Sequence, residues 1–408
     1  MVTARRGAAA IAAVAVIAGV AMFALIAHRD GRRRVTPAAS ASASSTSRVD
    51  LERTVAAMDA RLKDDPADRE AAVALADGLL RQSRVTGNAA LAVRAEQVAR
   101  AALRLSPGDE AVQRSLGAVL LSRHKFAEAA AAAERLAVRR PHDAALQGII
   151  GDGRVELGDY DEAFAAFDRM IAIRPDAASY ARVSYARELQ GDLPGALDLM
   201  RMAAEATSPR DVEAQAFAQS RLGYLELALG RADEASRRFR RADALFPGYP
   251  AVATGLAKVA LARGDAEAAL AIARRQFDQS ASAELAEAMG EAAARLGRAA
   301  EADRYYGIAE SMWRYDTPEP AMLARLMADR GRAPEEAVQI ARSAAEVRHD
   351  IFTDDALAWA LFKAGRVAEA RAASARALRT GTRDARIRAH AREIERAPVA
   401  RMAGGLAQ

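Results

Sequence analysis

Apolar residues recur at intervals of three and four along most of this chain, and short polar turns interrupt the recurrence. The stretch 144–175 shows one complete unit, with an apolar face in 144–157, a polar turn at 158–162 and a second apolar face in 163–174. Spacing by three and four places apolar side chains on one side of an α-helix. Each unit is therefore predicted to be a pair of amphipathic helices, and the fold class is all-α.

The turn and the end of this unit carry their own signals. Gly158 lies where the first helix must end, because glycine adopts the left-handed conformation at little cost. Asp159, Asp161 and Glu162 supply the negative charge that favours the start of a second helix. Pro175 cannot extend a helix and disfavours helix at the residue before it. These signals give the unit defined limits.

The unit repeats with a period close to 34 residues. Small residues lie in step at Gly117, Gly151, Ser184, Gly223, Ala257, Gly290, Ala324 and Ala358. Alanine follows twelve residues later at Ala129, Ala163, Ala196, Ala235, Ala269, Ala302 and Ala370. Such a period indicates a solenoid, in which each unit packs only on its neighbours. We expect about nine helix pairs between residues 68 and 381.

These positions resemble the tetratricopeptide repeat (TPR). Its pattern has a small residue, an alanine, a large residue and a proline at set places, which Gly151, Ala163, Phe167 and Pro175 occupy here. The resemblance implies an α-solenoid that coils as a right-handed superhelix. It also implies that the first helix of each pair lines a concave groove, with positions two, five and nine of the unit facing it.

The resemblance implies that the groove binds peptide or helical segments of protein partners. The candidate contacts are Phe217 at position two and Tyr185, Tyr224, Lys258, Glu291, Arg325 and Trp359 at position nine. Tyrosine, tryptophan and arginine often dominate binding interfaces. Two alternatives remain open: the aromatic residues pack between neighbouring units, and Glu284, Glu287 and Glu291 form a solvated face. The lysine and asparagine of the family's carboxylate clamp are absent from units two to four.

Candidate chemistry is missing from the chain. It contains no cysteine, its five histidines are scattered, and no motif for a metal, a phosphate loop or a serine nucleophile occurs. His124 lies where later units have the turn glycine, so we expect it in a turn. These absences predict a protein that is not an enzyme and that uses no cofactor or metal.

Residues 7–27 form an uncharged run of 21 residues, which as a helix would span about 31 Å, close to the thickness of a bilayer core. A cleaved signal peptide, a retained anchor and a buried helix are the alternatives, and the charged residues that follow at once favour the anchor. The predicted organisation is an anchor with basic flanks (1–34), an Ala/Ser linker (35–49), a TPR solenoid (50–381), and a capping helix with a frayed tail (382–408). The repeats are predicted to lie outside the cytoplasm.

The net charge of +5 comes entirely from residues 1–50, which hold seven arginines and two aspartates. The remaining residues are balanced, so we expect no nucleic-acid partner. The sequence thus predicts a membrane-tethered, non-enzymatic scaffold for protein–protein interaction. The alternative is an accessory subunit of an envelope-assembly or enzyme complex. The layout is similar to that of membrane-anchored bacterial TPR proteins.

Overall fold

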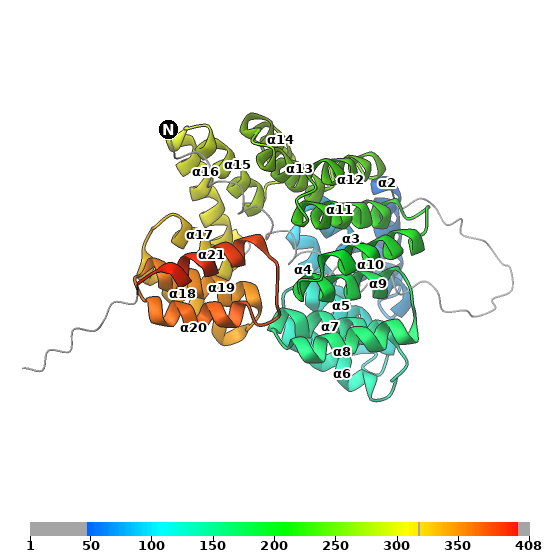
Figure 1. Cartoon of the computed structure of the whole chain (residues 1–408). Coiled ribbons are helices and arrows are strands. Elements are labelled where there is room, and N and C mark those ends of the chain that lie inside the picture. Colours follow the sequence, from blue (N-terminus) through cyan, green and yellow to red (C-terminus); the bar gives the residue numbers. More distant parts are fainter. Residues whose placement is uncertain (1–46, 317–318, 399–408) are drawn as a thin grey trace, which may run out of the picture.

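The computed structural model describes residues 47–316 and 319–398, and over these residues it contains helices and turns but no β-strand (Figure 1). After α2 (Arg48–Asp64), the helices form nine pairs: α3 (Arg69–Thr86) with α4 (Ala89–Leu105), α5 (Glu110–Ser122) with α6 (Phe126–Ala137), α7 (Ala144–Leu157) with α8 (Tyr160–Ile173), α9 (Ala177–Leu189) with α10 (Leu193–Ala206), α11 (Val212–Ala228) with α12 (Ala232–Leu245), α13 (Pro250–Ala262) with α14 (Ala266–Gln279), α15 (Ala283–Arg295) with α16 (Ala299–Ser311), α17 (Pro320–Asp329) with α18 (Pro334–Val347), and α19 (Ile351–Lys363) with α20 (Val367–Ala377). A last helix, α21 (Ala385–Arg396), follows them. The prediction of an all-α solenoid is confirmed.

The turns have the predicted chemistry. Gly158 adopts a φ of 88° and ends α7, and His124 adopts a φ of 56° at the corresponding turn two helices earlier. At the start of α7, the side chain of Asp143 accepts hydrogen bonds from the backbone N–H groups of Ala145 and Leu146. Such caps satisfy N–H groups that have no partner within the helix. Local sequence therefore fixes where these helices begin and end.

Small residues allow the paired helices to approach closely. A Cβ atom at Gly151 would lie 2.3 Å from the ring of Phe167, and Ala163 is fully buried. The ring of Phe239 is held in the same way by two glycines: Cβ atoms at Gly223 and Gly255 would lie 2.8 Å and 2.3 Å from it. Because Gly223 belongs to the same pair as Phe239 and Gly255 to the next, this ring joins one pair to its neighbour.

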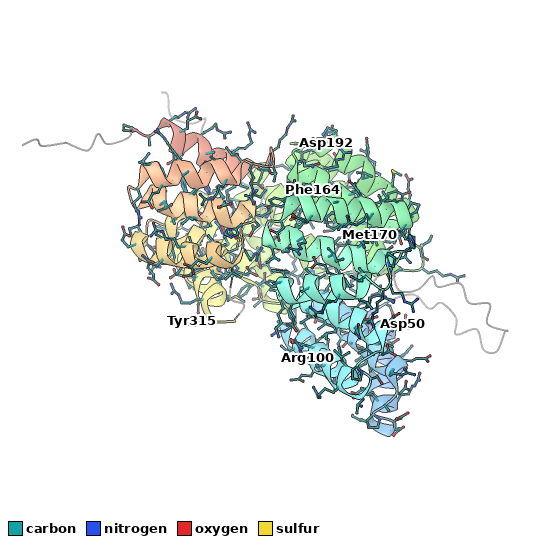
Figure 2. The ribbon with its side chains drawn as sticks, turned by 90° about the horizontal axis from the view of Figure 1, so that it is seen from below. Asp50, Arg100, Phe164, Met170, Asp192 and Tyr315 are labelled. Carbon is teal, nitrogen blue, oxygen red and sulfur yellow. The ribbon has the colours of Figure 1, made fainter. Side chains whose placement is uncertain are left out.

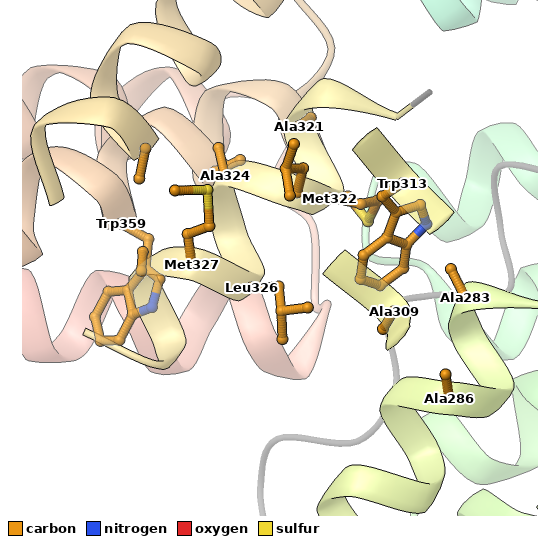
Figure 3. Packing of buried hydrophobic residues seen from close by; sticks show 14 of the residues in the cluster. Ala283, Ala286, Ala309, Trp313, Ala321, Met322, Ala324, Leu326, Met327 and Trp359 are labelled. Carbon is orange, nitrogen blue, oxygen red and sulfur yellow. The ribbon is translucent and has the colours of Figure 1, made fainter. Parts of the chain in front are cut away.

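Two elements carry no repeat signal. Helix α2 packs before the first pair, and a short π-helix, η2 (Met312–Asp316), follows α16. The side chain of Trp313 in η2 is 1% exposed and lies between Ala283 and Ala286 of α15 and Met322 of α17 (Figure 3). The extra residues between the seventh and eighth pairs thus fill the core between them. By contrast, Tyr315 points out of the surface (Figure 2).

The solenoid coils so tightly that its first pair contacts its middle, where α3 lies near α11 (Figure 1). Arg81 pairs with Asp211 at 2.8 Å, and Arg84 pairs with Glu213 at 3.2 Å. The hydroxyl of Ser280 donates to the backbone carbonyl of Thr86. These contacts join residues more than a hundred positions apart, so they are outside what a 34-residue period can predict.

The prediction of a single-pass membrane protein needs correction. Within residues 47–316 and 319–398, none of the helices combines the length and the apolar character that crossing a bilayer requires. The run 7–27 and most of the linker at 35–49, on which the prediction rested, lie outside the described residues. The predicted location of the repeats beyond a membrane is therefore withdrawn.

Replacing Gly151 with alanine tests the packing at the helix crossing. The new methyl group would overlap the Phe167 ring, so we expect a loss of about 1–3 kcal/mol in the free energy of unfolding. Gly307 in α16 is the matched control, because a Cβ there meets no atom within 4 Å. Gly307→Ala should stabilise the chain by about 0.5–1 kcal/mol. Urea unfolding followed by circular dichroism measures both, and equal effects would contradict the packing argument.

Candidate functional site

The first helices of successive pairs are linked by a series of polar contacts, which we call the first-helix ladder. Each contact joins a side chain on one first helix to a side chain on the next: Asp77–Ser115 at 2.9 Å, Asp152–Arg182 at 2.7 Å, Glu188–Arg221 at 2.6 Å, Glu287–Arg325 at 2.8 Å, Asp329–Trp359 at 2.8 Å and Asp355–His390 at 3.0 Å. The last contact joins α19 to α21. The ladder runs along the wall that the sequence predicts to line the groove.

The contacts of the ladder range from part-buried to fully buried, and burial shapes the electrostatics of the most enclosed pair. Asp152 and Arg182 are 1% and 2% exposed, and the guanidinium also donates to the carbonyl of Ala178. Burial raises the pKa of Asp152 to about 6, although the charge of Arg182 opposes the rise. Removing one partner of such a pair leaves an uncompensated charge. These contacts therefore hold neighbouring first helices at a fixed spacing.

Lys258 of α13 has a position on this wall but no partner in the ladder. Its ammonium is 5.8 Å from the ring of Tyr224 and finds no hydrogen-bond acceptor among the described residues. The residue is only 7% exposed. Burial and the nearby charge of Arg386 together lower the pKa of Lys258 to about 8, although the charges of Glu287, Glu291 and Asp384 oppose the fall. A buried, unpaired ammonium is costly, so Lys258 marks a place where an acceptor would be stabilising.

Two arginines on the same wall also keep unused donors. The Nη1 atom of Arg221 and the Nε and Nη2 atoms of Arg325 find no hydrogen-bond partner among the described residues. Both side chains are buried, and each uses one nitrogen atom in the ladder, Nη2 of Arg221 and Nη1 of Arg325. Together with Lys258, these donors lie on α11, α13 and α17. The middle of the wall therefore has more hydrogen-bond donors than the described residues satisfy.

The predicted contact residues all lie on this wall, but most are packed within it. Six of the seven are between 2% and 7% exposed: Tyr185, Phe217, Tyr224, Lys258, Arg325 and Trp359. The exception is Glu291, whose side chain is 34% exposed and pairs with Arg295. The hydroxyl of Tyr224 donates to the carbonyl of Ala251, and its ring meets Phe239 edge-on. Whether these seven residues bind a partner stays a prediction.

The sequence predicts a capping helix after residue 382, but it does not predict the contacts that α21 makes. The imidazole of His390 stacks on the indole of Trp359, with 4.0 Å between ring centroids, and contacts the carboxylate of Asp355. Helix α21 thereby covers the end of the first-helix wall. A lone histidine outside the repeats gives no sequence signal for such a contact, because the period does not extend to it.

Clusters of metal ligands are absent from the described residues. Among them, no group of three or more histidine, aspartate or glutamate side chains could hold a metal ion. One small pocket lies between α9 and the start of α21, with Tyr185, Glu188, Leu189, Phe352 and Asp384 among its lining residues.

Comparison with known proteins identifies the repeat. Family models described as tetratricopeptide repeat match residues 114–178, 150–211 and 226–291. Tetratricopeptide repeat protein 36 of Homo sapiens is 39% identical over 102 residues, which are 24% of this chain and 51% of that protein. Its counterpart in Mus musculus is 39% identical over 106 residues, 26% of this chain and 55% of that protein. This chain thus spans about half the length of the curated relatives it matches.

Among solved structures, a chain of the crystal structure of the APC/C hetero-tetramer Cut9-Hcn1 has a TM-score of 0.50 at 15% identity. The match covers 84% of this chain and 59% of that one, and at this identity it shows the fold alone. The protein is therefore an α-solenoid that contains tetratricopeptide repeats. The curated relatives are mammalian, so the resemblance to a membrane-anchored bacterial type finds no support among them.

Replacing Lys258 with methionine tests the charge at the gap in the ladder. With a folded-state pKa near 8, below the ordinary 10.5, the ammonium opposes folding at neutral pH. We expect Lys258→Met to raise the free energy of unfolding by about 1–3 kcal/mol at pH 7. The gain should vanish as the pH rises from about 8 to 10.5, because the unfolded chain then also loses the proton.

Arg182→Met is the matched control for that substitution. It removes an equally buried cation that has a partner, so it should destabilise the chain by about 3–5 kcal/mol. Urea unfolding at several pH values measures both variants. A loss of stability in Lys258→Met would mean that the ammonium has a partner that the structure does not show.

Proposed function

We propose that this protein is a non-enzymatic scaffold for protein–protein interaction, which binds an extended or helical segment of a partner along the first-helix wall. The TPR fold is suited to protein–protein interaction. The proposed binding region comprises α11, α13, α15 and α17, where the donors of Arg221, Lys258 and Arg325 are unsatisfied. Of the predicted contacts, we assign the polar anchoring to Lys258, Glu291 and Arg325.

The observation that carries this proposal is the gap in the ladder at Lys258. Other first helices exchange a polar contact with a neighbouring first helix, whereas the Lys258 ammonium finds no hydrogen-bond acceptor among the described residues. A donor left unsatisfied costs about 1–3 kcal/mol. A carboxylate or a backbone carbonyl from a partner segment would recover that cost on binding. The partner is therefore a segment that presents an acceptor between α11 and α15.

The remaining predicted contacts have a supporting role in this proposal. Tyr185, Phe217, Tyr224 and Trp359 are rigid aromatic residues that shape the wall, and their rings are largely covered by the chain itself. The indole N–H of Trp359 is already donated to Asp329, and its ring is stacked on the imidazole of His390, so its role is to shape the wall. Rings of this kind supply contact area at little entropic cost.

Selection of peptides on the full chain tests the proposal. A library of random peptides displayed on phage is enriched on the wild-type chain, and the affinity of the enriched peptides is measured by fluorescence polarisation. We expect the peptides to carry acidic residues, and we expect Lys258→Met to weaken their binding by about tenfold or more, as for loss of one charge-assisted hydrogen bond.

The stability of the variant makes this experiment decisive. Because Lys258→Met should fold at least as stably as the wild type, weaker binding reports the lost donor and not a damaged fold. Lys125→Met, at a half-exposed lysine that pairs with Glu96 on another surface, is the control and should bind normally. Enriched peptides that bind Lys258→Met with unchanged affinity would refute the assignment.

A further inference from the structure

The last two pairs fold back onto the middle of the solenoid. The loop 348–351 lies against the turn 156–160, and the loop 379–383 lies against the turn 190–191. We call these four segments together the clasp. Figure 1 shows the orange and red C-terminal helices beside the turquoise helices α7 and α8. The residues joined in this way are about 190 positions apart in the chain.

Arg348 is the polar centre of the clasp. Its guanidinium pairs with Glu156 at 2.8 Å and lies 5.0 Å from the ring centroid of Phe126. Backbone groups add directional contacts: the N–H of His349 donates to the carbonyl of Leu157, and the N–H of Ile351 donates to the hydroxyl of Tyr160. These hydrogen bonds fix the position of the loop on the turn to within one residue.

An apolar cluster completes the clasp. Ile351 and Ile387 from the C-terminal part are buried against Tyr160, Tyr185 and Leu189 from the middle. Phe164 of α8 packs against this cluster (Figure 2). Residues 382–385 line the same pocket as Tyr185 and Glu188. The chain's own C-terminal segment therefore covers the first-helix wall where α9 would otherwise be exposed.

Glycine at two turns makes this approach possible. A Cβ atom at Gly158 would lie 2.3 Å from the backbone of His349, and a Cβ atom at Gly191 would lie 2.4 Å from the carbonyl oxygen of Gly381. Real Cβ atoms do not come that close to backbone atoms. The equivalent turn glycines Gly230 and Gly264 have a similar positive φ and open space around them. Gly158 and Gly191 thus allow the close approach of the C-terminal loops as well as the turns in which they lie.

We propose that the clasp is a reversible cover over the α9 end of the first-helix wall, which must open before a partner segment can reach Tyr185. This inference rests on the proposed function, because it concerns access to the same wall. The cover is held by a small apolar cluster and a few polar contacts, which is less than what holds the neighbouring pairs together. Local opening of such a weakly held part is expected before global unfolding.

Hydroxyl-radical footprinting of the full chain tests the clasp without a ligand. Gly158→Ala places a methyl group against His349 and should open the clasp, so we expect oxidation of Tyr185 to rise several-fold. Oxidation of Tyr249, which is equally buried but outside the clasp, should stay constant. Mass spectrometry of tryptic peptides measures both tyrosines in the same sample.

Gly264→Ala is the matched control, because it adds the same methyl group at a similar φ where nothing is touched. It should leave both tyrosines protected. Arg348→Met is a second variant, which removes the ion pair with Glu156 and should open the clasp without altering a turn. It tests the proposal even if Gly158→Ala does not fold. Unchanged oxidation of Tyr185 in both clasp variants would overturn the proposal. An absence of enriched peptides would refute the proposed function but leave this measurement intact.

The pH dependence of the clasp follows from the groups around Glu156. Burial raises the pKa of Glu156 to about 7, from an ordinary value of 4.5. Although burial opposes it, the ion pair with Glu319 raises the pKa of His124. The charged and titratable groups that face Glu156 from the surrounding elements are Arg348, Asp350, Glu319, His124, Tyr160 and Tyr185.

Glu156 belongs to the clasp and is buried when the clasp is closed, so its raised pKa belongs to the closed state, which binds more protons than the open one. Opening is therefore favoured as the pH rises from about 5 to above 7. The ratio of Tyr185 to Tyr249 oxidation should increase over this range, and Glu156→Gln should flatten most of the increase. A ratio of Tyr185 to Tyr249 oxidation that rises on acidification would contradict this account.

Discussion

The packing of aromatic rings against glycine is the constraint on which the rest of the structure depends. A pair of amphipathic helices cannot bury its apolar face alone, so it needs the pairs beside it. The ring of Phe239 lies against Gly223 of its own pair and Gly255 of the next, and either glycine would clash with it if a Cβ were added. One side chain thus sets the distance within a pair and the distance between pairs. The spacing of the wall follows from it.

This constraint explains which features the sequence reveals. A small residue is required wherever two paired helices cross, and it therefore recurs about every 34 positions. The pairs and their turns can thus be predicted from residues such as Gly151, Ala163 and Gly158. Helix α2 and Trp313 in η2 are outside the period, and only the assembled core shows their role. The contact between Glu156 and Arg348 likewise cannot be predicted from the repeat, because it joins two helix pairs that are far apart in the sequence.

For the candidate site, the sequence predicts which helices carry the residues but not what surrounds them. Position nine of each unit lies on a first helix, as Tyr185 on α9, Lys258 on α13 and Trp359 on α19 show, and their role in binding stays a prediction. The burial of these side chains depends on which residue each one meets on the next helix, such as Ala251 for Tyr224. A period aligns equivalent positions, but it does not say which charges become partners. Lys258 is informative because its ammonium finds no hydrogen-bond acceptor in the part of the chain that the structure describes.

The two proposed features of the wall are physically connected. The start of α21 brings Arg386 and Asp384 near Lys258, and the like charge of Arg386 adds to the cost of burying that ammonium. A partner segment that replaced residues 382–386 would remove this repulsion while its own carboxylate met the unused donor. Binding and opening would then favour each other, and the observed affinity would be reduced by the fraction of molecules that are closed. Substitutions that loosen the clasp should therefore tighten binding even though they lie outside the contact itself.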